Sequence, residues 1–257
     1  IEEYIKDESV KGLFCVPKYS NPDGITFSDE VVRRFAALKP AAKDFRVIWD
    51  NAYIVHDLND TPDKLLNIFD EAKKCGSEDM FIEVISTSKI SFAGGGISAV
   101  IASDANIAEI KKRMSIQIIS NDKINQLRHA RYFKNLDGIK AHMKKQAAIL
   151  KPKFDAVTDG FEKAFDGTGI ASWKKPNGGY FISLFVMNGC AKRVGQLCKE
   201  AGLTLTTVGA TYPYGIDPDD SNIRIAPSYP DVDELKKAVD LLCICVKLAA
   251  AEKLTEE

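Results

Sequence analysis

Hydrophobic and polar positions along this chain alternate between short apolar runs and longer amphipathic stretches. In the first half, short apolar runs bounded by turn residues predict strands at residues 10–16, 46–49, 80–85 and 97–102. Between them, apolar positions recur at helical spacing and predict helices at residues 31–38, 63–75 and 106–114. Strands that alternate with helices of this length indicate an α/β fold with a mostly parallel central sheet.

The second half of the chain has a different pattern. A long helical stretch at residues 122–165 predicts a bridge to a second domain. Beyond it, strands are predicted at residues 170–173, 180–186, 203–208 and 223–226, and helices at residues 191–201 and 232–253. Few short strands with two covering helices indicate a smaller α+β unit. We therefore predict one domain at residues 1–135 and a second, including the bridging helix, at residues 136–257.

Composition narrows the classes of partner. The 257 residues include 35 Lys and Arg against 36 Asp and Glu, which gives a formal net charge of −1. This balance lacks the positive footprint that nucleic acid or an anionic membrane surface attracts, so we expect neither as a partner. No apolar run is long enough to span a bilayer, and we expect a soluble, cytoplasmic protein.

The metal-binding residue types are scattered along the chain. The six cysteines form no C-x-x-C pair, and most lie in apolar or helical contexts, which is typical of buried free thiols in a reducing compartment. The three histidines, at positions 56, 129 and 142, have no second ligand at metal spacing. We therefore predict neither a metal site nor disulfides.

A lysine in an unusual position is the strongest candidate for chemistry. The apolar run at 80–85 leads into Ser86 and Ser88, then Lys89, and then a glycine cluster at 94–96. A lysine at the end of an apolar strand, among short and hydroxylic neighbours, is suited to imine formation with an aldehyde, and the two hydroxyls can hold an anion. The alternative is an ordinary lysine whose ammonium group lies in water.

Other candidates follow neighbouring strands. Asp50 and Tyr53 come directly after the run at 46–49, where an aspartate can pair with a protonated ring nitrogen and a tyrosine can donate to a phenolate-type oxygen. An ordinary turn explains them equally well, and a turn is also the simpler reading of Asn21. Because parallel strands bind ligands beyond their carboxyl ends, we expect Asn21, Asp50 and Lys89 to converge on one crevice.

Arg224 lies between two isoleucines in the predicted strand at 223–226. Successive side chains of a strand point to opposite faces, so Arg224 points away from its neighbours. A planar guanidinium placed in this way suits a carboxylate held by two parallel hydrogen bonds. The alternative is a structural ion pair.

Taken together, these motifs are more specific than any one of them. The motifs are Asn21-Pro-x-Gly24, Asp50-x-x-Tyr53, Ser86-x-Ser88-Lys89, and Ile223-Arg224-Ile225 after a Gly-Gly-Tyr-Phe segment. This ordered set resembles the class I/II aminotransferases of the fold-type I pyridoxal-phosphate enzymes. Within them it is most similar to the aspartate aminotransferase subgroup related to the MocR aminotransferase-like domain. The resemblance covers essentially the whole chain.

The resemblance implies a role for each candidate residue. Lys89 matches the lysine that links to pyridoxal 5'-phosphate and moves a proton between the substrate Cα and the cofactor's C4′. Asp50 matches the residue that keeps the ring nitrogen protonated, which lets the ring accept electrons. The remaining matches are Asn21 and Tyr53 for the ring oxygen, Ser86 and Ser88 for the phosphate, and Arg224, with Asn21, for the substrate carboxylate.

The resemblance also implies a reaction, an assembly and a domain assignment. We expect a transaminase that moves an amino group from an amino acid, with aspartate as the first choice, to a 2-oxo acid, and a homodimer when full length. Residues 1–135 would be the carboxyl-terminal half of the large cofactor-binding domain, and residues 136–257 the small domain. A fold-type I lyase or decarboxylase, a non-catalytic ligand sensor of the MocR kind, and an inert remnant remain open as alternatives.

Two departures from the family pattern qualify these expectations. Many relatives carry a phosphate-binding arginine about two turns after the lysine, whereas residues 91–100 contain none. The chain begins at Ile1, and relatives normally begin well before the matching position. We therefore expect a carboxyl-terminal part of a longer protein that binds the cofactor poorly by itself.

Overall fold

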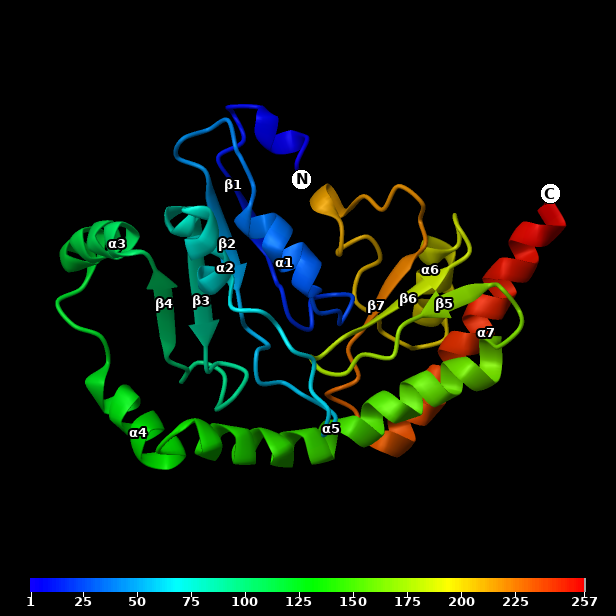
Figure 1. Ribbon diagram of the computed structural model, residues 1–257. Helices are drawn as coiled ribbons and strands as arrows, with labels where there is room; N and C mark the ends of the chain where they lie inside the picture. Colours follow the sequence, from blue (N-terminus) through cyan, green and yellow to red (C-terminus); the bar gives the residue numbers. More distant parts are fainter. Residues whose placement is uncertain (257) are drawn as a thin grey trace. The chain divides into compact units, whose positions relative to one another are not determined.

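The computed structural model describes residues 1–256, which divide into two compact units (Figure 1). The first unit comprises Ile1–Lys18, Ile25–Val55 and Asp63–Met143, and the second comprises Tyr19–Gly24, His56–Pro62 and the chain from Lys144 onward. The predicted boundary at 135/136 falls at the break between two helices, eight residues before the observed division at 143/144. The end of the predicted second domain, residue 257, lies outside the described residues.

The first unit is built on a four-stranded sheet. Its strands are β1 (Gly12–Cys15), β2 (Arg46–Asp50), β3 (Phe81–Ser86) and β4 (Ser98–Ala102), in the order β1-β2-β3-β4. The first three strands are parallel, and β4 is antiparallel to β3. A parallel crossover needs roughly a dozen residues or more, usually a helix, and residues 87–97 form only a loop, so β4 folds straight back. The predicted α/β fold with a mostly parallel sheet is confirmed.

Helices α1 (Asp29–Ala36) and α2 (Ile68–Cys75) pack on the same aromatic core as the sheet. Trp49 of β2 is 1% exposed and contacts Phe35 of α1 and Phe81 of β3 edge to face. Helix α2 is shorter than the predicted 63–75 because Asn67 is its N-cap: the Asn67 side chain accepts from the backbone N–H groups of the next turn. Short 3₁₀ helices occur at Tyr4–Lys6 and Glu78–Met80.

The long helix predicted at residues 122–165 is divided in two, and three helices follow β4 before the next strand. These are α3 (Asp104–Gln117), α4 (Lys123–Phe133) and α5 (Leu136–Phe165). Lys134 is the C-cap of α4, and its positive φ of 64° departs from helical geometry and ends the helix before α5 begins. The single helix expected over 122–165 is therefore wrong at this point, because a lysine gives no warning of a C-cap that glycine would have signalled.

The second unit holds an antiparallel sheet, the part of α5 from Lys144 onward, and two further helices. Its elements are β5 (Ala171–Trp173), β6 (Ile182–Val186), α6 (Ala191–Glu200), a 3₁₀ helix at Pro213–Gly215, β7 (Asn222–Ile225) and α7 (Val232–Glu256). The strand predicted at 203–208 is not formed. Its apolar residues, Leu203, Leu205 and Val208, instead pack one by one against the core from an irregular segment. The α+β description of this unit is confirmed.

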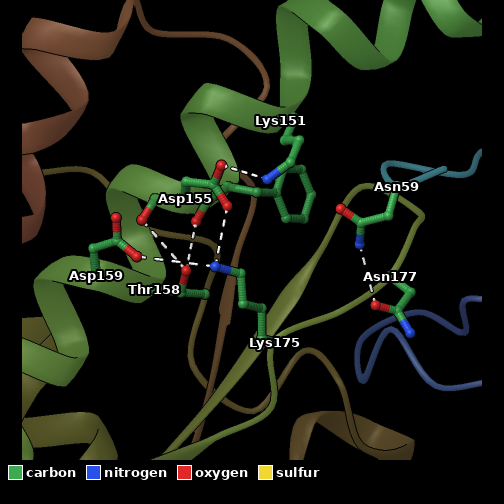
Figure 2. Close-up of polar contacts among 8 residues, drawn as sticks. Asn59, Lys151, Asp155, Thr158, Asp159, Lys175 and Asn177 are labelled. Carbon is green, nitrogen blue, oxygen red and sulfur yellow. Dashed lines mark hydrogen bonds and ion pairs between the residues drawn. The ribbon is translucent and has the colours of Figure 1, made fainter. Parts of the chain in front are cut away.

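A polar network ties the loop before β6 to α5 within the second unit (Figure 2). Nζ of Lys175 lies 3.1 Å from the carboxylate of Asp155, which also binds Lys151 at 2.6 Å. Burial acts to raise the pKa of Asp155, but these two ammonium groups outweigh it, so the pKa lies below its ordinary value. Two residues further on, Oδ1 of Asn177 accepts from Asn59 at 3.2 Å. The loop is thus held at two points.

None of the helices in the described part of the chain combines the length and the apolar composition needed to cross a membrane. All six cysteines are free thiols, as predicted, and four of them are buried.

Candidate active site

Asp50 and Tyr53 are presented by the carboxyl end of β2. Val47 and Trp49 face the core, so Asp50 lies on the opposite face of the strand and is half-buried. Oδ1 of Asp50 accepts from the backbone N–H of Ala52 at 3.0 Å, the turn contact that its residue type favours. Burial, and then the Asp50 charge, raise the pKa of the neighbouring Cys15 thiol to about 12. The carboxylate therefore acts both as a turn acceptor and as a local negative charge.

Lys89 lies in the turn that follows β3, the neighbouring parallel strand. Ser86 ends β3, and its Oγ lies 2.8 Å from Oγ of Ser88 and accepts from the Ser88 backbone N–H at 3.1 Å. Ser88 and Lys89 are exposed, whereas Tyr53 is 4% exposed. Nζ of Lys89 lies 5.1 Å from the centroid of the Tyr53 ring, within cation–π range. The first unit thus brings Lys89 and Tyr53 together, and the two serines together.

The glycine cluster folds back onto this turn. A Cβ atom on Gly96 would lie 2.6 Å from Oγ of Ser88 and 2.8 Å from its backbone nitrogen, so only glycine allows this approach. Thr87 and Ile97 close the loop through two hydrogen bonds: Thr87 N–H to Ile97 O at 2.8 Å, and Ile97 N–H to Thr87 Oγ1 at 2.9 Å. The loop after β3 is therefore a closed structure that presents Ser88 and Lys89 outward.

Arg224 and Asn21 form a separate group in the second unit. In β7, Ile223 and Ile225 are buried and Arg224 is half-buried, which confirms that the arginine points away from its neighbours. Nη1 of Arg224 donates to Oδ1 of Asn21 at 3.1 Å, and the guanidinium lies 4.8 Å from the centroid of the Phe181 ring. Its buried Nε has no hydrogen-bond partner within residues 1–256. A guanidinium with unused donors, paired with an amide, is available to a carboxylate ligand.

The predicted site residues thus occupy both units. Asp50, Tyr53, Ser86, Ser88 and Lys89 belong to the first unit, on the carboxyl ends of adjacent parallel strands. Asn21 and Arg224 belong to the second. The convergence of Asn21 with Asp50 and Lys89 stays a prediction.

A buried carboxyl group was missed by the sequence analysis. Glu83 of β3 is 9% exposed, points to the same face as Phe81, and accepts from the side-chain amide of Asn51, the residue after Asp50. Burial raises the pKa of Glu83. The signal was available: a lone charged residue in an apolar strand, two positions from an inward-facing phenylalanine. Glu83 and Asn51 thus link the middle of β3 to the residue that follows β2.

We expect Glu83→Gln to stabilise the protein increasingly as pH rises. Because the folded pKa of Glu83 is raised above its unfolded value of about 4.5, wild-type stability is lost as pH rises through the folded pKa. Glutamine keeps an acceptor for Asn51 and does not ionise. Urea unfolding between pH ~5 and ~8 measures the difference, and exposed Glu8→Gln is the control. Parallel pH profiles for Glu83→Gln and wild type would contradict this assignment.

The chain matches known proteins along its whole length. The family described as "Aspartate amino-transferase" matches residues 1–257. An aspartate aminotransferase of Corynebacterium glutamicum is 45% identical over 252 residues, which is 98% of this chain and 58% of the relative. The chain therefore spans somewhat more than half the length of this relative.

Solved structures show the same fold. A crystal structure of an aspartate transaminase from Corynebacterium glutamicum superposes with a TM-score of 0.96 at 45% identity, covering 98% of this chain and 59% of that one. The α-aminoadipate aminotransferase of Thermus thermophilus, solved with N-(5'-phosphopyridoxyl)-L-leucine, has a TM-score of 0.73 at 16% identity and covers 93% and 59% of the two chains. At that identity the likeness shows the fold alone. The link to the MocR aminotransferase-like domain stays a prediction.

Proposed function

Because this chain belongs to the aspartate aminotransferase family, we propose that it is the part of a pyridoxal-phosphate-dependent transaminase that holds the reactive lysine. The observation that carries the proposal is Lys89, exposed in a closed loop after β3 and set beside Tyr53, with Asp50 on the adjacent parallel strand. The reaction moves an amino group from an amino acid to a 2-oxo acid. Aspartate is the first donor to test, since the 45% identical relative is named for it.

The residues present fit pyridoxal 5'-phosphate. A primary amine, a carboxylate, a phenol and a pair of adjacent hydroxyls match its aldehyde, ring nitrogen, ring oxygen and phosphate, and the lack of a side chain on Gly96 lets the loop backbone close against Ser88. When bound, the cofactor supplies an electron-accepting ring that stabilises the charge left on a deprotonated Cα. Hydroxyl groups and backbone N–H groups would bind the phosphate, because residues 91–100 contain no arginine.

Each residue of the chain then has a defined task. The Lys89 amine would hold the cofactor through its aldehyde and, once displaced by the substrate amine, would take the proton from the substrate Cα and return it to the former aldehyde carbon of the cofactor. Asp50 would accept a hydrogen bond from the ring N–H and keep the proton on that nitrogen. Tyr53, and Asn21 from the second unit, would donate to the ring oxygen. Arg224 donates two N–H bonds to the α-carboxylate, which orients the Cα–H bond, and Asn21 steadies the guanidinium through the observed contact.

Kinetics with pairs of substrates test the proposal. The purified protein with pyridoxal phosphate is incubated with single amino acids and several 2-oxo acids. We expect parallel double-reciprocal lines, as in a ping-pong mechanism, and formation of a new amino acid that depends on the 2-oxo acid. Release of CO₂ or ammonia without any need for a 2-oxo acid would replace the transaminase with a lyase or decarboxylase. If the absorbance spectrum of pyridoxal phosphate does not change when the protein is added, a non-catalytic role is supported.

We expect Arg224→Gln to lower kcat/KM for amino acid donors on the order of 10²–10³-fold. The change removes the charged donors while an amide remains to contact Asn21. Arg224→Lys keeps the charge but loses the two-pronged geometry, and we expect an intermediate loss. Arg113→Gln, on an exposed face of α3, is the control. Equal losses for donors with and without an α-carboxylate would contradict the role of Arg224.

We further propose residues 1–135 as part of the large cofactor-binding domain, residues 136–257 as the small domain, a homodimer of the whole protein, and the cytoplasm as its location. The division of the chain within α5 supports a domain boundary in this region. The six free thiols are those expected in a reducing compartment. Light scattering on the purified protein tests the dimer.

A further inference from the structure

Helix α4 makes several contacts with the loop that presents Lys89. Asn125 and His129 are four residues apart on α4 and therefore lie on one face of the helix. The Asn125 side chain donates to the carbonyls of Gly95 and Gly96, at 2.8 and 3.3 Å. These contacts hold the glycine end of the loop. His129 holds the lysine end.

The His129 ring bridges two hydroxyls. Its Nε2 lies 2.9 Å from Oγ of Ser91 and 3.0 Å from Oγ1 of Thr87, and its Nδ1 lies 2.9 Å from the carbonyl oxygen of Asn125. A carbonyl oxygen only accepts, so Nδ1 donates to it, and Nε2 is the ring atom that faces the two hydroxyls. One Nε2 atom thus binds hydroxyls that come two residues before and two residues after Lys89.

The segment between the two hydroxyls is a single turn. The N–H groups of Ile90 and Ser91 and the Ser91 hydroxyl all bond to the Thr87 carbonyl, at 2.9, 2.8 and 3.0 Å. A single turn of this kind is unstable by itself, because fixing its dihedral angles costs more than its few hydrogen bonds return. Contacts from elsewhere must hold it in place.

The His129 ring is buried and packed between aromatic side chains. His129 is 6% exposed, stacks on Phe92 at 6.4 Å between centroids and packs against Phe133 at 6.0 Å. A second histidine also contacts the turn: Nε2 of His142 in α5 lies 2.9 Å from the carbonyl oxygen of Ile90. Of this set, only His129 binds both flanks of Lys89.

We propose that His129 is a positioning residue for Lys89: it fixes the Thr87–Ser91 turn and thereby the direction in which the lysine amine is presented. The inference rests on the proposed function of Lys89. His129 acts through the hydroxyls of Thr87 and Ser91 and does not itself take part in the reaction of Lys89. If His129 only filled space in the core, another ring of similar size could replace it without effect on Lys89. Replacement by such a ring therefore distinguishes a positioning role from a packing role.

Three variants test the proposal. His129→Phe keeps a buried ring and removes both nitrogens, and His129→Gln restores a polar group of similar reach. The double variant Thr87→Val with Ser91→Ala removes the hydroxyls and leaves His129 in place. Phe161→Leu, in the fully buried core of the second unit, is the matched control for loss of stability alone.

The main readout is the rate at which Lys89 forms a borohydride-trapped adduct with pyridoxal phosphate, measured by peptide mass spectrometry and normalised to exposed Lys112. Hydrogen exchange at the amides of residues 88–91 is the second. For His129→Phe and for the double variant we expect adduct formation to slow about 10-fold or more and exchange to accelerate similarly. His129→Gln should recover most of the rate. Phe161→Leu should leave both readouts near wild type despite a lower melting temperature.

The outcomes separate the two claims. All variants are made in the whole protein, and wild-type protein without any adduct on Lys89 overturns the proposed function and the positioning role together. The positioning role alone is overturned if the wild type forms the adduct and His129→Phe forms it at the same rate. It is also overturned if His129→Phe slows adduct formation only as much as Phe161→Leu does. If His129→Phe does not fold, the double variant decides by the same criteria.

Discussion

Replacing Lys89 with alanine is expected to abolish the borohydride-trapped adduct with pyridoxal phosphate and to lower transaminase activity about 10⁴-fold or more. The reason is that, in the proposed mechanism, Lys89 would provide both the covalent attachment of the cofactor and the proton transfer at the substrate Cα. Its side chain is exposed, so the change should alter the free energy of unfolding by no more than about 0.5 kcal/mol. Mass spectrometry of the reduced protein, with steady-state kinetics, measures both effects.

The controls for Lys89→Ala use the same unit of the protein. Lys112→Ala removes an exposed lysine from α3, and both adduct and activity should stay at wild-type levels. Lys89→Arg keeps a positive charge near the Tyr53 ring but is a poor imine-forming amine, and it should lose the adduct as fully as alanine does. An adduct that persists in Lys89→Ala would show that another lysine is the reactive one.

The general α/β plan follows from the sequence, because apolar runs and helical periodicity are local signals. Phe81–Ser86 and Arg46–Asp50 are strands close to the predicted bounds, and the residues beyond them hold the candidate site. The failures occur where a local signal is ambiguous. Residues 203–208 have strand-like composition, but in the part of the chain that the structure describes they pair with no neighbouring strand. Leu203 and Leu205 instead pack separately against the core of the second unit.

The site was predictable only in part, for a related reason. Arg224 and Lys89 stand out because each is a charged residue in an apolar context. His129 does not, because its role depends on the approach of α4 to a loop more than thirty residues earlier, a tertiary contact with no local pattern. Glu83 lies between these two cases. Its position in an apolar strand is visible in the sequence, but its partner Asn51 follows a different strand, β2, and the sequence does not show that the two meet. Sequence periodicity identifies which side chains are unusual, and the fold determines what they contact.

Replacing Asp50 with asparagine is expected to lower activity on the order of 10²–10³-fold while leaving the fold and the Lys89 adduct intact. The two roles of Asp50 can be separated in this way. Asparagine retains the oxygen that accepts from the Ala52 N–H group, so the turn after β2 persists. It lacks the charge that would keep a proton on the ring nitrogen of the cofactor. Activity, thermal stability and adduct formation measured on one preparation distinguish these effects.

The thiol of Cys15 provides an independent check that the charge has been removed. Its pKa of about 12 is raised mainly by burial and in addition by the Asp50 carboxylate, so Asp50→Asn should lower it and speed alkylation at alkaline pH. Asp50→Ala removes the turn acceptor as well, and it should cost a further ~1 kcal/mol of stability. If Asp50→Asn alters Cys15 alkylation but keeps wild-type activity, the carboxylate is only a turn residue and the proposed pairing with the ring nitrogen is wrong. If activity falls while stability is retained, the charge itself is what the reaction requires.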